Sequence, residues 1–278
     1  MYYRLLLLLF LLVPEENFSS ILSYESFAGY SSTSIIGQNK TTSGFSGAWT
    51  GTGNNTVAGS SLVLSNTPKL FNPGNSGRLQ VYGPATVTRN LNIPSIFSAY
   101  STDGVNINKG KLYISFLMDG SGQGAFKLGS LSVGRFTNIN YSGGSGGVFG
   151  VDLGGDTNAD YILPNIDPRN GTSLSHTQWA RNFILELNLA TGNDSISLWL
   201  DPISATESSS PDLIISSADI SFNNISIFSA TSFSSATIDE IYFGSTFGDV
   251  LMVIPEPSAL SLLAVGLGGL AMLRRRRS

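Results

Sequence analysis

The chain has 278 residues, of which 12% are charged and 41% are hydrophobic, and its formal net charge is −4. This composition argues against a disordered chain, because disorder normally combines low hydrophobicity with high charge. The sequence shows no basic patch, which argues against nucleic acid as a partner. There is no cysteine, so disulfide bonds, thiol chemistry and cysteine-rich zinc sites are excluded.

The first residues predict an export signal. Arg4 precedes a continuously apolar run over residues 5–13, and this order is typical of a secretory signal peptide. The run is too short to cross a membrane comfortably. We therefore predict a signal peptide over residues 1–23. The cleavage site within residues 13–23 stays open because no Ala-x-Ala pattern follows the run.

Residues 24–249 alternate between apolar and polar side chains, as half-buried strands do. Strands of this kind are expected at residues 111–118, 183–189, 195–200 and 238–243. Residues 191–194, Thr-Gly-Asn-Asp, predict a tight hairpin between the second and third of these strands. No stretch of this region keeps a 3.6-residue period. We therefore predict one all-β domain, a two-sheet jelly-roll sandwich.

Two segments of the predicted domain resemble a known group. Tyr-Glu-Ser-Phe at residues 24–27 and Gly-Phe-Ser-Gly-Ala-Trp at residues 44–49 are similar to the opening of exported concanavalin A-like, LamG-like proteins. Residues 188–202 and 238–244 resemble the last strands of that group. The resemblance implies a concanavalin A-like jelly roll of about a dozen strands.

Glycoside hydrolysis needs two carboxylates on either side of the scissile bond. The laminarinase-like pattern Glu-x-Asp-x-x-Glu is absent, and Asp239 with Glu240 is the nearest pair. Adjacent residues of a strand point to opposite faces, so these two are not expected to act together. Glu186 has no neighbouring acid in the sequence. We expect no catalytic residue, with a polysaccharide-active enzyme as the alternative.

Two further motifs are weak. Gly-Gly-Ser-Gly-Gly at residues 143–147 matches Gly-x-Ser-x-Gly, a motif that matters only on a strand-to-helix elbow, and no helix is expected there. His176 is the only histidine and is expected to be an ordinary loop residue. Ice binding needs a regular threonine array, and Thr231 and Thr237 are irregularly placed.

Three aspartates, Asp152, Asp156 and Asp160, recur at steps of four. Loop carboxylates of this kind hold calcium in many proteins, but aspartate is also a common turn residue. These residues are therefore weak calcium candidates, and no other cofactor is expected.

The C-terminal segment, residues 250–278, has three parts in order. Residues 254–258 contain Pro255, Glu256, Pro257 and Ser258, residues 259–273 are apolar, and Arg274, Arg275, Arg276 and Arg277 follow. The apolar run predicts a transmembrane helix whose short length the flanking arginines offset. By the positive-inside rule the arginine cluster stays in the cytoplasm, which places the β-domain beyond the inner membrane.

This arrangement resembles the PEP-CTERM sorting signal. The resemblance implies recognition by exosortase, a membrane-embedded cysteine transpeptidase, with processing near the Pro-Glu-Pro. The two prolines lack amide hydrogens and cannot continue a helix, so they present an extended segment at the membrane surface.

The sequence thus predicts an exported protein of the cell surface or extracellular matrix. It would be structural or would adhere to exopolysaccharide through aromatic residues such as Tyr100, Tyr141 and Trp179. The alternatives are a secreted polysaccharide-active enzyme and a protein that stays anchored in the membrane.

Overall fold

The computed structural model describes residues 21–40, 42, 44–59, 62, 77–121, 123–136, 148–154, 159–163, 180–202 and 210–251. These residues form thirteen strands and two short helical turns. The strands are β1 (Ile21–Glu25), β2 (Phe45–Ala58), β3 (Arg78–Leu91), β4 (Gly110–Ser121), β5 (Gly124–Leu128), β6 (Leu131–Phe136), β7 (Val148–Asp152), β8 (Tyr161–Ile162), β9 (Arg181–Leu189), β10 (Asp194–Leu200), β11 (Leu213–Ala218), β12 (Asn224–Ser229) and β13 (Ser235–Gly244). The helical turns are η1 (Ser98–Tyr100) and α2 (Phe247–Val250).

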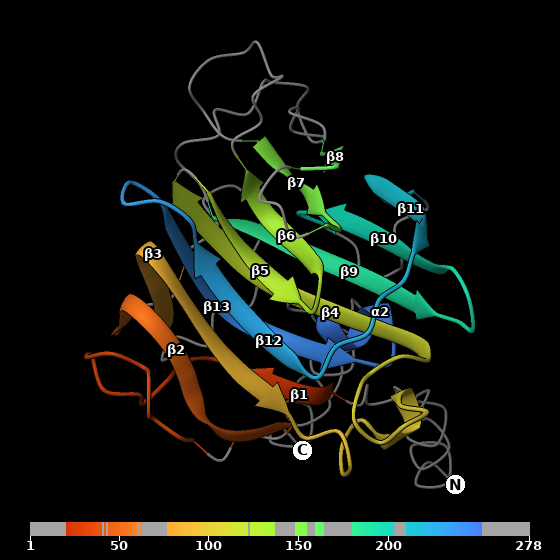
Figure 1. Cartoon of the computed structure of the whole chain (residues 1–278), viewed down its shortest axis with the longest axis horizontal. Coiled ribbons are helices and arrows are strands. Elements are labelled where there is room, and N and C mark those ends of the chain that lie inside the picture. The colour runs from red at the N-terminus through yellow and green to blue at the C-terminus, as the bar shows by residue number, and fades with distance from the viewer. Residues whose placement is uncertain are drawn as a thin grey trace, which may run out of the picture.

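The strands lie in two layers that face each other (Figure 1). The front layer holds β2, β3, β12, β5, β6, β7 and β8, and the back layer holds β1, β13, β4, β9, β10 and β11. All the pairings are antiparallel. The predicted all-β, two-layer fold is confirmed.

The layers are joined at β3, which changes partner along its length. Its first half pairs with β13 of the back layer, Leu79 opposite Ile238. Its second half pairs with β12 of the front layer, Val87 opposite Ile227. The hydrogen bonds therefore run through one curled sheet rather than two separate ones, which the sequence did not predict.

The main core lies between the layers and follows the predicted alternation. Leu112, Ile114, Phe116 and Met118 of β4 are all fully buried. Phe116 stacks on Phe183 of β9 at 5.2 Å and contacts Phe126 of β5 at 4.5 Å between ring centroids. Aromatic side chains of both layers thus meet at the centre, where they bury large apolar areas.

The predicted hairpin is also confirmed. β9 ends at Leu189 and β10 begins at Asp194, with Asn188 opposite Ser195. The Asp194 carboxylate accepts a 2.8 Å hydrogen bond from the Ala190 amide and closes the turn. Polar residues of this connection therefore satisfy the backbone that the strands leave unpaired.

The back layer is buried on both faces near its middle, whereas the sequence predicted one buried face. Tyr113, Ile184 and Trp199 point away from the main core, yet they are buried with α2 and Leu62 in a second apolar cluster. Figure 1 shows α2 behind β4. Because α2 and Leu62 cover this face, the outward residues of these strands are apolar.

The first strand begins earlier than the expected domain boundary. β1 starts at Ile21 and pairs with the end of β13, whereas the sequence placed the signal peptide at residues 1–23. Residues 21–23 therefore form part of β1, and the bounds of the signal peptide stay a prediction.

Candidate functional site: the C-terminal junction and the carboxylate bulge

The folded domain ends in a short helical turn that is fixed to the back layer. Thr246 caps α2, and its hydroxyl accepts the amide of Asp249 while the Asp249 carboxylate accepts the amide of Thr246. This reciprocal pair is a capping box, which satisfies backbone donors at the start of a helix. The last described residue, Leu251, follows directly.

Side-chain contacts hold this turn against the sheet. The Phe247 ring lies edge-on to Trp199 at 5.1 Å and to Tyr113 at 6.3 Å. The Ser115 hydroxyl of β4 donates a 2.7 Å hydrogen bond to the Val250 carbonyl. The chain therefore leaves the described domain from the outer face of the back layer.

The surroundings of the Asp249 carboxylate favour its ionised form, which accepts hydrogen bonds. Burial alone would raise its pKa, but hydrogen bonds from Thr246 and Ser245 outweigh burial and lower the pKa. The Ser245 amide and hydroxyl donate to it at 2.8 and 2.9 Å. The ionised form that caps α2 is thus the favoured one.

A bulge in β13 brings Asp239 and Glu240 to the same face of the sheet. The register of β13 against β4 shifts between Asp239 and Tyr242, and Glu240 has a φ of +53°. Such a bulge inserts an extra residue and breaks the alternation of side chains. The prediction that Asp239 and Glu240 point to opposite faces is therefore wrong.

The surroundings of the two carboxylates confirm this placement. Asp239 accepts a 2.9 Å hydrogen bond from the Leu62 amide. Glu240 accepts hydrogen bonds from Tyr24 at 2.5 Å and Tyr242 at 3.2 Å. Leu62 and Tyr242 belong to the second apolar cluster, and Tyr24 packs against it. Ile238 and Ile241, on either side of the bulge, both face the main core.

The bulge carboxylates lie in a strongly desolvated place. Asp239 is 0% exposed and Glu240 1%. Burial, together with the charge of Glu240, raises the pKa of Asp239 to about 8. Burial and Glu240 also raise the pKa of Tyr242. The pair therefore has electrostatics often found at functional sites but lacks the access that a glycosidic bond would need.

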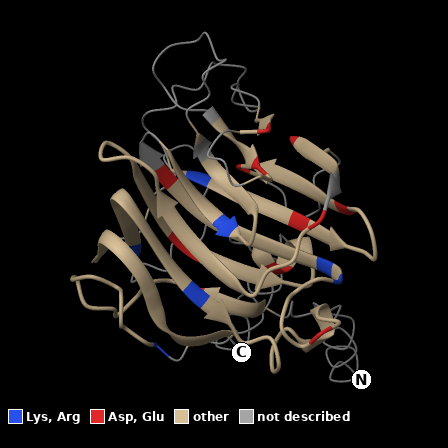
Figure 2. Cartoon of the chain, viewed as in Figure 1, with Lys and Arg blue, Asp and Glu red and all other residues tan. Residues whose placement is uncertain are grey.

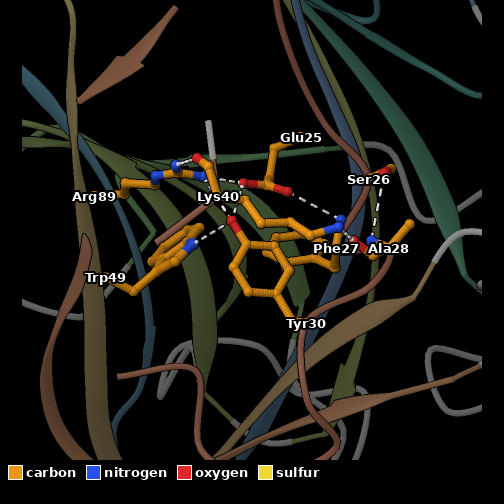
Figure 3. A network of polar contacts seen from close by, with 8 residues as sticks. All are labelled: Glu25, Ser26, Phe27, Ala28, Tyr30, Lys40, Trp49 and Arg89. Carbon is orange, nitrogen blue, oxygen red and sulfur yellow. Dashed lines mark hydrogen bonds and ion pairs between the residues drawn. The ribbon is translucent and has the colours of Figure 1, made fainter. Parts of the chain in front are cut away.

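A second buried polar network joins β1 to β3 (Figure 3). Arg89 forms an ion pair with Glu25, and both side chains are 1% exposed. Tyr30 donates to Glu25 at 2.9 Å and accepts from Arg89 at 2.8 Å. The Arg89 guanidinium also lies 5.0 Å from the Phe45 ring and 5.8 Å from the Trp49 ring.

The charged groups of this network also form hydrogen bonds with backbone groups of the same chain. Arg89 also donates to the Lys40 carbonyl, and Glu25 accepts the Phe27 amide at 3.1 Å. Burial raises the pKa of Glu25, although the Arg89 charge opposes this shift. The network thus fixes the loop after β1 onto β3, and its charges face each other rather than an open site.

The other acidic residues singled out in the sequence have structural contacts. Glu186 accepts a 2.6 Å hydrogen bond from Tyr113 and lies 3.0 Å from the Lys111 ammonium. Asp152 accepts the Gly154 amide at 2.9 Å, and Asp160 accepts the Leu153 amide at 2.8 Å. Asp156 lies outside the described residues. Across the described residues, no group of three or more acidic or histidine side chains is placed to hold a metal ion, so calcium binding stays a prediction.

The aromatic candidates have different outcomes. Tyr100 is half-buried in η1 and packs against the main core. Tyr141 and Trp179 lie outside the described residues, as do residues 143–147 and His176. The sequence missed Tyr82 and Phe233, which are 37% and 91% exposed. Strand alternation does not show whether the outward ring of Tyr82 stays uncovered, and Phe233 lies in the connection between β12 and β13, where alternation does not apply.

The expected signal peptide and the C-terminal residues Pro255, Glu256, Pro257, Ser258, Arg274, Arg275, Arg276 and Arg277 lie outside the described residues. Comparison with known families nevertheless decides the nature of the C-terminal segment, because residues 253–277 match the PEP-CTERM protein-sorting motif. The chain carries a PEP-CTERM sorting signal. This signal implies exosortase as the processing partner, export, and sorting to the cell surface.

The PEP-CTERM motif begins at residue 253, and the described domain ends at Leu251. The sorting segment therefore starts almost directly after the turn that is fixed to the back layer. Among the described helices, none has the length and apolar character needed to cross a membrane.

Solved structures similar to this chain include the globular domain of Trypanosoma cruzi calreticulin. That match has a TM-score of 0.42 and 12% identity, and it covers 92% of this chain and 100% of the other. Peanut lectin has a TM-score of 0.32 and 13% identity, covering 69% and 91%. An endo-1,3-beta-glucanase from Streptomyces sioyaensis has a TM-score of 0.33 and 12% identity, covering 81% and 95%. At this similarity the neighbours carry no argument about ligand or reaction.

A comparison with curated proteins found no match to this chain.

Proposed function

We propose that this protein is processed by exosortase within the Pro-Glu-Pro segment and that its β-domain is then displayed as a non-catalytic module of the extracellular polysaccharide. The observation that carries the proposal is the position of the PEP-CTERM motif at residues 253–277, directly after a folded β-domain. In this arrangement the enzyme acts on the tail, and the β-domain is the cargo.

The burial of the bulge carboxylates supports the non-catalytic role. Two carboxylates that hydrolyse a glycoside must flank the bond, with room for the sugar between them. Asp239 and Glu240 are adjacent and buried, and their oxygens accept hydrogen bonds from Leu62 and Tyr24. Their arrangement stabilises the bulge and leaves no room for a substrate.

Replacement of the sorting residues in the native host tests the role of the tail. A variant with Pro255→Ala, Glu256→Ala and Pro257→Ala keeps the apolar segment and the arginines. We expect it to accumulate in the inner-membrane fraction at its unprocessed mass, whereas the wild type reaches the surface or the medium.

A matched control changes Ser261→Ala, which leaves residues 254–258 intact, and it should be sorted like the wild type. Equal sorting of the wild type and the triple variant would contradict the proposal and would favour permanent anchoring. Release of reducing sugar by the purified protein that disappears in Glu240→Gln would favour the enzyme alternative.

A further inference from the structure

The outer face of the front layer carries hydroxyl side chains in register across three strands. Thr50 of β2 lies opposite Thr88 of β3, which lies opposite Ser226 of β12. Thr52 lies opposite Thr86 in the neighbouring row. Residues directly opposite on one face have Cβ atoms about 5 Å apart, so these five side chains form one patch, here called the hydroxyl face.

The residues between them point inward, which sets the direction of the hydroxyls. Trp49, Val87, Ile225 and Ile227 are all buried in the main core. Thr50 and Thr52 are exposed, and Thr86, Thr88 and Ser226 are half-buried. The Thr88 and Ser226 hydroxyls lie 2.8 Å apart and share one hydrogen bond, and the Ser226 hydroxyl also lies 3.5 Å from the Asn224 amide oxygen. The Thr50 hydroxyl donates to the Thr88 carbonyl at 3.4 Å. Because a hydroxyl has one donor and two acceptor positions, these groups retain acceptor capacity for a ligand.

The strands that form this face carry almost no charge (Figure 2). β2 and β12 contain no charged residue, and β3 contains Arg78 and Arg89 alone. Arg89 points inward to Glu25. The next position in the row is Lys127, opposite Ser226 on β5, and its ammonium lies 5.0 Å from the Phe228 ring. The five hydroxyl side chains themselves carry no charge and Lys127 lies at their edge, so a ligand that matches these five side chains is polar and uncharged.

Two exposed rings lie at one end of the face. Tyr82 is on β3 opposite Ser235, and Phe233 is in the connection between β12 and β13. The Gly83 amide donates a 3.1 Å hydrogen bond to the Ser234 carbonyl, which holds this connection beside Tyr82. Exposed rings next to hydroxyls offer both an apolar contact and hydrogen bonds, as mixed binding surfaces do.

The hydroxyl face also lies on the layer opposite the C-terminal junction. α2 and Leu251 contact the outer face of the back layer, from which the sorting segment departs. A domain held through that segment has its front layer on the far side (Figure 1).

We infer that the hydroxyl face, together with Tyr82 and Phe233, binds a neutral polysaccharide chain. Sugar hydroxyls exchange hydrogen bonds with Thr50, Thr52, Thr86 and Thr88, and the C–H faces of the sugar rings contact the two aromatic rings. This inference rests on the proposed display of the domain and names the surface and ligand class that the proposal leaves open.

The test uses the mature protein purified from its native host. Its migration is measured in native gels that contain dextran, galactomannan, laminarin or, as an acidic comparison, alginate. We expect at least one neutral polysaccharide to retard the protein. The double variant Thr86→Val and Thr88→Val keeps side-chain shape but removes two hydroxyls, so its apparent affinity should fall about five-fold or more. Tyr82→Ala should weaken retardation independently.

Thr191→Val is the matched control, because Thr191 is exposed in the connection between β9 and β10 of the back layer. It should bind like the wild type, and thermal unfolding shows whether each variant folds. Retardation by alginate alone, equal retardation of the double variant and the wild type, or no retardation in any gel would overturn the inference. A failure of sorting would instead appear in the mass of the C-terminus, so the two proposals fail separately.

Discussion

Arg89 and Glu25 show what a single buried charge contributes to this domain. Both side chains are 1% exposed, and Tyr30 bridges them. The attraction between two such charges offsets the loss of their hydration only while both partners are present. The sequence did not predict this ion pair, because Glu25 and Arg89 are far apart along the chain.

We predict that Arg89→Met lowers the free energy of unfolding by about 3–5 kcal/mol, because it leaves Glu25 buried without its partner. Urea unfolding at neutral pH measures this change. Adding Glu25→Gln to the variant should restore part of the loss. As a control, Lys111→Met breaks the ion pair to Glu186, but Lys111 is 49% exposed, so the change should stay below about 1 kcal/mol. Equal losses in the two single variants would contradict this account.

The pKa of Asp239 predicts how stability depends on pH. The folded carboxyl has a pKa of about 8 against an ordinary value of 3.8. Between these values the folded state holds a proton that the unfolded state has released. The contribution of Asp239 is therefore complete below pH 4 and is lost as pH rises through 8. Each unit of difference corresponds to about 1.4 kcal/mol.

Asp239→Asn should therefore flatten the dependence of the unfolding free energy on pH between 5 and 8.5, measured by urea titration at several pH values. Glu25 contributes in the same direction, since burial raises its pKa too, so some slope should remain. An unchanged slope in the variant would show that Asp239 is ionised in the folded state.

Among the secondary-structure elements, α2 is a four-residue turn that depends on its contacts. Helices this short are not stable alone, so Phe247 and the capping box hold it in place. Phe247→Ala removes a buried ring, a change that costs about 3–5 kcal/mol in a packed core. We expect faster hydrogen exchange at residues 247–250, measured by mass spectrometry, and a smaller effect on the amides of β9.

Phe233→Ala serves as the control for this prediction, because Phe233 is 91% exposed. Its removal should leave exchange at α2 and global stability nearly unchanged. If Phe247→Ala left exchange at residues 247–250 at the wild-type rate, α2 would not depend on the ring contacts described for it.

Strand positions were predictable where local alternation decided them, as in β4, β9 and β10. The prediction was wrong in β13, because Glu240 adopts a positive φ and the bulge reverses the alternation. A bulge depends on a change of neighbours, here from β3 to β1, and such partners are not visible in one stretch of sequence. The second apolar cluster was missed for the same reason, since α2 and Leu62 cover strands distant in sequence.

In the whole molecule, the sorting motif was the clearest functional signal in the sequence. Its proline, apolar and arginine parts are contiguous, and the comparison with known families confirms it at residues 253–277. The hydroxyl face was not predictable, because Thr50, Thr88 and Ser226 meet only through strand pairing. Thr231 and Thr237, the threonines that the sequence suggested for a regular array, are not part of this face. The side chain of Thr237 is buried and does not contribute to an open surface.

The position at which the chain leaves the domain determines which layer lies next to the sorting segment. The chain leaves the outer face of the back layer at Leu251, and the sorting segment begins at residue 253. Processing near Pro-Glu-Pro would leave only a few residues after α2. An attachment there would lie next to the outer face of the back layer, on the side of the domain opposite the front layer.

The mass of the C-terminal peptide of the mature protein, purified from its native host, tests the central claim most directly. Exosortase processing predicts a peptide that ends near residues 255–258, either bare or with a covalent adduct. An intact peptide that extends through Arg277 would contradict processing and would identify the segment as a permanent anchor.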